Sequence, residues 1–258
     1  MKHLTTLSAL LLLAVSAHAE EGWISLFNGK DLSGWIPKIT KHPLGENAMN
    51  TFRVEDGMIK VSYDDYGGKF DGQFGHLYSE LAYSSYILRL EYRFEGKQLP
   101  DGPGFALQNS GVMFHCQPPS SLKLNQDFPV CFEFQFLAAA GEGERATANL
   151  CTPATNVWMD GKLVTNHVIP SSAPTFQPGE WVTMELEVHG SKEAIHRING
   201  KEVLRYQQLE LDPENGVGDA QALLKRGAPK AVAFGHLALQ SESQPVWFRN
   251  IEIKPLEE

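Results

Sequence analysis

Hydrophobic and polar residues alternate in short runs along most of this chain. The clearest runs are 86–94, 131–136 and 181–188, in which every second residue is apolar. A period of two indicates β-strands that bury one face and leave the other face polar. Shorter runs of the same kind occupy 52–55, 58–63, 111–116, 194–198, 202–206, 236–240 and 246–253.

Turn residues separate these runs. Asp56-Gly57 and Asn199-Gly200 each stand between two alternating segments, and such pairs predict tight β-hairpins. The one helix-like stretch is 219–226, and no internal repeat or break in composition is evident. Many short strands with this punctuation predict an all-β sandwich or barrel, which we expect to form one domain over residues 20–258.

The N-terminus predicts export. Lys2 precedes a short apolar run over 4–16, and Ala17-His18-Ala19 has the small-residue pattern of a signal-peptidase site. The apolar run is shorter than the roughly 20 residues that span a bilayer, which favours a cleaved signal peptide over a membrane anchor. We therefore expect residues 1–19 to be removed and the mature protein to be periplasmic or secreted, without a membrane attachment.

Composition narrows the function. The formal net charge of −9 disfavours nucleic acid, which requires a basic surface, and 14 Phe residues are sufficient for a large core. Sequence motifs of serine hydrolases, nucleotide-binding enzymes and His-Glu-x-x-His zinc proteases are absent. The three cysteines Cys116, Cys131 and Cys151 permit at most one intramolecular disulfide, and their spacing does not indicate a metal site.

The strand at 131–136 carries the first candidate chemistry. Phe132, Phe134 and Phe136 share one face and mark it as the core, which places Glu133 and Gln135 on the other face. That face is either an ordinary solvated surface or a groove for a ligand.

The run 111–116 is a candidate neighbouring strand, and two registers compete for it. One places His115 beside Glu133, a pair able to transfer protons near neutral pH. A register displaced by one residue instead pairs Cys116 with Cys131 and separates His115 from Glu133. We favour the first register.

Other ionisable residues are less specific. His76, His167 and His196 are each more often structural than catalytic when considered singly. Loop carboxylates at Asp64, Asp65 and Asp71 could bind calcium, but solvated loops have the same composition. We expect no cofactor and no metal.

Several blocks, in order, give the chain a resemblance to a known family. They include an opening Gly-Trp-x-x-Leu-Phe-Asn-Gly segment, an Asn-Ser-Gly strand, a Glu-x-Gln strand and a closing Trp-Phe-Arg-Asn-Ile strand. Together they resemble the 3-keto-disaccharide hydrolase domain family over nearly the whole mature chain, in the blocks 22–35, 52–57, 74–78, 88–94, 109–115, 132–135, 147–153 and 239–251.

The resemblance implies a concanavalin A-like jelly-roll sandwich of two antiparallel sheets, with sugar bound over the concave sheet. It also implies cleavage of the glycosidic bond in a 3-keto glycoside by elimination and hydration, together with a dehydrogenase that forms the ketone. On this basis the expected catalytic residues are Glu133 and His115, and the expected substrate-binding residues are Gln135, Asn149, His167, Gln240 and Glu242.

Two other functions are open. An ordinary glycosidase would use two carboxylates, such as Glu133 and Glu242. A non-catalytic, lectin-like carbohydrate-binding module is compatible with the same fold, because a fold does not determine a function. A carboxylate or imidazole held beside the bond would favour an enzyme over a lectin.

Overall fold

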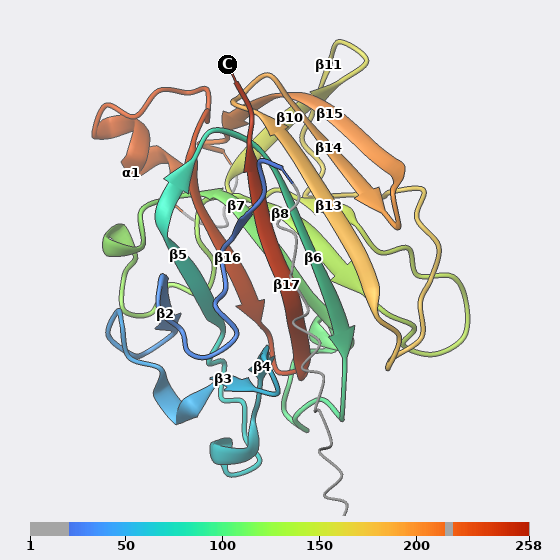
Figure 1. Cartoon of the computed structure of the whole chain (residues 1–258). Coiled ribbons are helices and arrows are strands. Elements are labelled where there is room, and N and C mark those ends of the chain that lie inside the picture. Colours follow the sequence, from blue (N-terminus) through green and yellow to red (C-terminus); the bar gives the residue numbers. More distant parts are fainter. Residues whose placement is uncertain (1–20, 215–218, 258) are drawn as a thin grey trace, which may run out of the picture.

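The computed structural model describes residues 21–214 and 219–257, and this part of the chain forms two packed antiparallel sheets. The predicted signal peptide, residues 1–19, lies outside the described residues. Figure 1 shows β6, β17 and β13 of the larger sheet side by side. The predicted all-β sandwich of two antiparallel sheets is confirmed.

The two sheets have the following strand orders. The larger sheet runs β11 (Lys162–Val164), β10 (Thr155–Met159), β15 (Lys201–Leu211), β14 (Glu193–Ile198), β13 (Val182–His189), β6 (Ser85–Phe94), β17 (Val246–Pro255), β4 (Met58–Val61), β3 (Phe52–Glu55), with β1 (Ile24–Ser25) paired to β17. The smaller sheet runs β12 (Val168–Ile169), β9 (Asn149–Cys151), β8 (Phe132–Leu137), β7 (Asn109–Cys116), β16 (Gly235–Ser241), β5 (Gly75–Tyr83), β2 (Trp35–Ile39).

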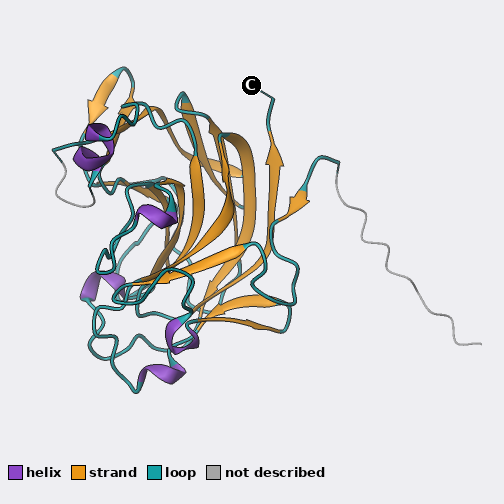
Figure 2. Ribbon diagram, turned by 90° about the vertical axis from the view of Figure 1, so that its left-hand side faces the viewer, coloured by secondary structure: helices purple, strands orange, loops and turns teal. Residues whose placement is uncertain are grey.

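Helical segments are short. The helix α1 (Ala220–Lys225) falls within the expected stretch, and the Asp219 side chain caps it by accepting a hydrogen bond from the Ala222 amide. Single 3₁₀ turns occupy Ala48–Asn50, Asp64–Tyr66, Gly104–Ala106 and Pro119–Ser121. Figure 2 shows that the helices and long loops gather on one side of the curved strands. Among the described residues, no helix has the length and apolar character needed to cross a bilayer.

Both predicted hairpins are confirmed. The pair Asp56-Gly57 connects β3 to β4, and Asn199-Gly200 connects β14 to β15. All four residues have positive φ angles, between 49° and 77°. Positive φ at both central positions is the geometry of the type I′ turn that Asn-Gly and Asp-Gly favour.

The core lies between the sheets and is rich in aromatic side chains. Phe132, Phe134 and Phe136 of β8 are fully buried, as the alternation predicted. Phe136 stacks on Tyr92 of β6 with ring centroids 3.9 Å apart, and Phe134 stacks on His196 of β14 at 4.0 Å. This packing fixes β8 against the larger sheet and directs the alternate residues of β8 to the outer face of the smaller sheet.

Candidate functional site

A row of polar side chains crosses the outer face of the smaller sheet. Strand register places Gln135 opposite Gly111 and Asn149, and it places His76 opposite both Gln240 and Lys38. These residues lie on one face because each occupies a matching position on neighbouring strands. We call the row the polar stripe, and its members are Lys38 (β2), His76 (β5), Gln240 (β16), Gln135 (β8) and Asn149 (β9).

Part of this face is covered by the loop 117–130. The Lys38 ammonium donates to the carbonyl oxygens of Ile39 and Leu124, at 2.8 and 3.0 Å. Leu122 of the same loop packs on the buried cluster that contains Tyr78. The loop shelters part of the sheet surface, and four of the five stripe residues, all but Gln135, are buried.

Glu133 lies beside the stripe and is 6% exposed. Its side chain extends over Gly111 of β7, where an added Cβ would lie 2.5 Å from Glu133 Oε1. Burial raises the pKa of the Glu133 carboxyl to about 8, and a hydrogen bond with the Cys151 thiol partly opposes this rise. The carboxyl is therefore poised to gain or lose a proton near neutral pH.

A second buried carboxyl, Glu242, follows the end of β16. Gln240 Nε2 donates to Glu242 Oε1 at 3.4 Å, while Glu242 Oε2 is buried without a protein partner. Burial and, to a smaller extent, the negative charge of Glu133 raise the pKa of Glu242 well above its usual value. Two neighbouring carboxyls in such a site disfavour simultaneous ionisation.

Glu242 Oε2 is one of several polar atoms on and around this face that lack hydrogen-bond partners within the described part of the protein. A buried polar atom without a partner costs free energy, so a cluster of such atoms indicates a binding site for a polar ligand. The cluster comprises His76 Nε2, Tyr78 Oη, Asn109 Oδ1, Gln240 Oε1 and Glu242 Oε2.

The predicted pairing of His115 with Glu133 is wrong. Met113, not His115, lies opposite Glu133 in the register of β7 and β8. A β-bulge follows Met113, and His115 has a φ of 48°, so its ring turns away from the site. His115 Nδ1 and Nε2 lie 3.1 and 3.3 Å from the carbonyl oxygens of Val232 and Ser84.

His115 is therefore a buried structural residue. Burial lowers its pKa to about 4, and its ring packs edge-on against Tyr86. The alternative register, with Cys116 opposite Cys131, is also not adopted. The three cysteines Cys116, Cys131 and Cys151 are buried free thiols.

The remaining predicted site residues have different positions. Gln135 and Asn149 lie side by side, and Asn149 Nδ2 donates to Gln135 Oε1 at 3.1 Å. Asn149 Oδ1 accepts from the Ser171 amide, so this side chain is held in place. His167 is exposed beside β12, at the edge of the same sheet, and its backbone carbonyl accepts hydrogen bonds from the Thr152 amide and the Thr152 hydroxyl.

The histidines that were considered individually also differ in position. His76 belongs to the polar stripe, and burial together with the Lys38 charge lowers its pKa to about 3. His196 lies in the core, where its ring nitrogens contact the Ala148 carbonyl and the Tyr206 hydroxyl. Asn109, which also faces the site, was not predicted as a site residue, although it opens the Asn-Ser-Gly block.

The acidic loop residues considered for calcium are engaged in ion pairs. Arg53 contacts Asp64 and Asp65, at 2.9 and 2.8 Å, and Lys41 contacts Asp71 at 2.9 Å. Over 21–214 and 219–257, no group of three or more His, Cys, Asp and Glu side chains is arranged to hold a metal ion.

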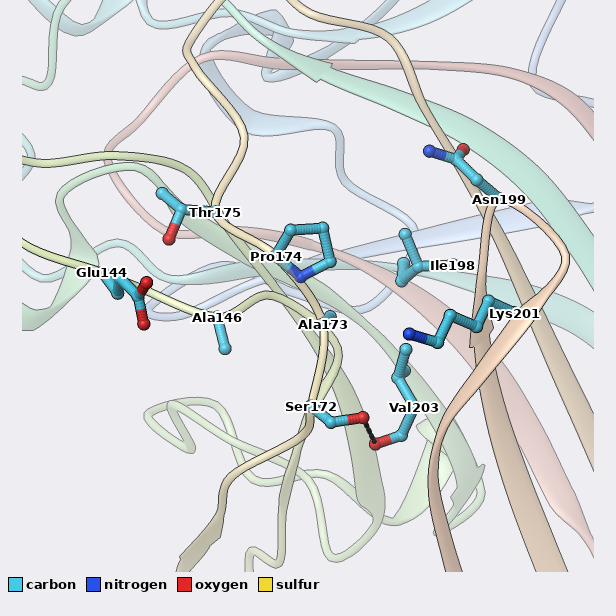
Figure 3. Close-up of a pocket in the computed structure, with 10 residues that line it drawn as sticks. All are labelled: Glu144, Ala146, Ser172, Ala173, Pro174, Thr175, Ile198, Asn199, Lys201 and Val203. Carbon is cyan, nitrogen blue, oxygen red and sulfur yellow. Dashed lines mark hydrogen bonds between the residues drawn. The ribbon is translucent and has the colours of Figure 1, made fainter.

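A separate surface hollow, shown in Figure 3, lies between the 144–146 and 172–175 segments and the β14–β15 turn. Its volume is 780 Å³, and the hydrogen bond drawn there joins Ser172 Oγ to the Val203 carbonyl. It offers Glu144 as its one carboxylate. The paired carboxyls at Glu133 and Glu242 therefore make the outer face of the smaller sheet the better candidate for chemistry.

The raised pKa of Glu133 predicts a pH-dependent stability. Between pH 4.5 and about 8 the folded protein retains a proton that the unfolded chain releases, so the free energy of unfolding falls as the pH rises through this range. Over this pH interval the free energy of unfolding falls by at most about 5 kcal/mol. Urea denaturation at pH 5 and pH 8 should show that Glu133→Gln gains stability relative to the unmodified protein, and gains more at pH 8.

Glu185→Gln is a suitable control for that measurement, because Glu185 lies on the other sheet, paired with Arg197. Equal stability differences at both pH values for Glu133→Gln would contradict the raised pKa.

Comparison with solved structures supports the fold. A candidate glycosyl hydrolase from Parabacteroides distasonis aligns with a TM-score of 0.54 and 20% identity, covering 92% of this chain and 95% of that chain. Another from the same organism aligns at 0.53 and 18%, covering 91% and 99%. A Bacillus subtilis protein of unknown function with a galectin-like fold aligns at 0.53 and 11%, covering 90% and 94%.

The sequence comparisons address the family directly. No curated protein matches the chain significantly. The model of the 3-keto-alpha-glucoside-1,2-lyase-like domain matches residues 22–254, which includes every strand of both sheets except the last residue of β17. The resemblance drawn from the sequence blocks is thus confirmed, and the chain belongs to the 3-keto-alpha-glucoside-1,2-lyase-like domain family.

Proposed function

We propose that this protein is an enzyme that cleaves the glycosidic bond of a 3-keto glycoside by elimination followed by hydration. The observation that carries the proposal is the pair of buried carboxyls, Glu133 and Glu242, on a sheet face rich in unpartnered polar atoms. A lectin site binds hydroxyls with amides and aromatic rings and has no need of two carboxyls whose pKa values are raised by burial.

The chemistry follows from the ketone. A carbonyl at C3 acidifies the proton at C2, and a base removes this proton to form an enolate. The C1–O bond then breaks, the aglycone leaves as an alcohol after it accepts a proton, and a C1=C2 double bond remains. Water adds across that double bond and yields the free 3-keto sugar. The reaction requires a base, an acid and donors for the enolate oxygen.

The two carboxyls divide these roles. The Cys151 thiol stabilises the Glu133 carboxylate by a hydrogen bond, whereas Glu242 Oε2 has no such donor and lies near a negative charge. Glu133 therefore ionises first and serves as the base at C2. Glu242 retains its proton and donates it to the leaving oxygen. Gln240 and His76, on the polar stripe, are the donors available for the enolate oxygen.

Incubation of the purified protein with a 3-keto glucoside and with the parent glucoside tests the proposal. We expect aglycone release from the keto sugar alone, because only the ketone makes the C2 proton removable. Release from the parent glucoside would instead indicate an ordinary two-carboxylate glycosidase built on Glu133 and Glu242. Binding of sugars without release of an aglycone from either substrate would indicate a carbohydrate-binding module.

The cellular setting forms part of the proposal. An exported enzyme, periplasmic or secreted, would meet glycosides outside the cytoplasm, in agreement with the predicted signal peptide at 1–19. Its substrate contains a ketone that ordinary glycosides lack, so a dehydrogenase that oxidises C3 must act before it.

A further inference from the structure

An exposed aromatic ring lies at one end of the candidate site. Phe105 is 58% exposed, although a phenyl ring normally becomes buried. It belongs to the 3₁₀ turn Gly104–Ala106, which precedes β7. Its ring is parallel to that of Phe74, with an interplanar angle of 6° and centroids 6.4 Å apart. Its orientation is thereby set by a buried neighbour while much of its surface stays open.

The aromatic contacts continue from Phe105 to the polar stripe. Phe74 packs against Phe128 at 4.9 Å, and Phe128 packs edge-on against His76 at 6.2 Å. Phe105 is thus the exposed end of an aromatic group that reaches the stripe. Seven other large hydrophobic side chains among the described residues are also exposed, namely Ile24, Leu44, Leu81, Leu124, Leu163, Val168 and Phe234. Phe105 differs from them in its aromatic contact with the group that reaches the stripe.

Asn109 connects this ring with the catalytic face. Asn109 Nδ2 donates to the Phe105 carbonyl at 3.0 Å, and Asn109 Oδ1 is left buried without a protein partner. The side chain is 5% exposed. Asn109 and Gly111 point to the same face of β7, about 6.8 Å apart along the strand. Glu133 lies over Gly111, so the distance from the Glu133 position to Asn109 is comparable with the length of one sugar ring.

The loop that carries Phe105 is anchored. Leu99 N donates to the Ser243 carbonyl at 3.1 Å, and Gln98 Nε2 donates both to Ser243 Oγ and to the Pro103 carbonyl. An added Cβ at Gly102 would overlap Ser243 Oγ, which shows how closely the loop packs there. The ring is therefore held in place before any ligand arrives, which reduces the entropy lost on binding.

We propose that Phe105 and Asn109 form the subsite for the leaving-group sugar. This second pyranose ring stacks on Phe105, and one of its hydroxyls donates a hydrogen bond to Asn109 Oδ1. The proposal rests on the proposed function and adds the residues that recognise a leaving group that is itself a sugar. Pyranose rings present apolar C–H faces, and an aromatic ring with an exposed face contacts them favourably. Asn109 Oδ1 then gains the partner that it lacks within the protein.

Kinetics with two substrates test the subsite. We expect Phe105→Ala to raise KM for 3-keto-glucosyl-glucose disaccharides about tenfold, with kcat nearly unchanged. The same variant should leave KM for methyl 3-keto-glucoside unchanged, because a methyl group does not reach the ring. Phe105→Trp should retain the unmodified KM. Phe234→Ala is the matched control, since Phe234 is 66% exposed in a different loop.

A binding measurement separates failure of the subsite from failure of the reaction. Calorimetric titration of the disaccharides into Glu133→Gln protein, with and without Phe105→Ala, measures the contribution of the Phe105 contact to binding affinity in the absence of turnover. About tenfold weaker binding in the double variant supports the subsite even if no aglycone is released. Equal affinity in both proteins, equal effects on both substrates, or no disaccharide binding to Glu133→Gln protein would overturn it.

Discussion

Glu133→Gln is expected to lower kcat on a 3-keto glycoside at least about a thousandfold, which is within the range of losses when a general base is removed. The amide retains the size of the carboxyl, so its place over Gly111 and its burial remain possible. It cannot accept the C2 proton. In the unmodified enzyme, kcat/KM should rise as the pH passes through about 8, because the base is active only when ionised. Stopped assays of aglycone release at pH 6 to 9 measure both effects.

Glu185→Gln removes a carboxylate from the opposite sheet and controls for the change in net charge. It should keep activity within about twofold, as expected for a surface substitution. Retention of full activity in Glu133→Gln would exclude Glu133 as the base. A loss of activity together with a lower thermal midpoint would indicate damage to the fold instead, whereas the raised pKa predicts a midpoint that is unchanged or higher.

Much of the architecture was accessible from the sequence because one-sided strands leave a period-two pattern. Phe132, Phe134 and Phe136 identified the core face of β8 and so placed Glu133 and Gln135 on its outer face. The hairpins at Asp56-Gly57 and Asn199-Gly200 could also be predicted, because their turns require positive φ angles that Asn, Asp and Gly adopt readily. Each of these inferences depends on residues close together in the sequence.

The details of the site depended on pairings that the sequence does not encode locally. The register of β7 and β8 differs from the one expected by two residues, which leaves Met113 opposite Glu133. The bulge that turns His115 away is not marked by a glycine in the sequence, because His115 itself takes the positive φ there.

Burial of the site was also not predictable. The loop 117–130 covers part of the outer face through hydrogen bonds such as that between Lys38 and the Leu124 carbonyl. A long-range contact of this kind determines whether a carboxyl on a sheet is solvated or buried with a raised pKa. Sequence alternation identifies the face on which Glu133 lies, and the burial of Glu133 in the folded protein raises the pKa of its carboxyl.

The small size of residue 111 is the second requirement of the site. The Glu133 side chain extends across Gly111 toward β16. The φ angle of Gly111 lies outside the left-handed region, so the backbone at this position tolerates alanine. An added methyl group would lie 2.5 Å from Glu133 Oε1 and 2.8 Å from its Cγ. These atoms belong to a flexible side chain, which will move rather than unfold the strand.

Gly111→Ala should therefore lower kcat about a hundredfold while the protein stays folded, because a displacement of about 1 Å in a catalytic group has this order of effect. Gly104→Ala is the control, since an added Cβ there meets no atom within 4 Å, and it should keep kcat within about twofold. Combining Gly111→Ala with Glu133→Gln should cost little more than Glu133→Gln alone, because both changes act through the same carboxylate. Independent, multiplicative losses in kcat would show that residue 111 acts on the reaction by a route other than the position of Glu133.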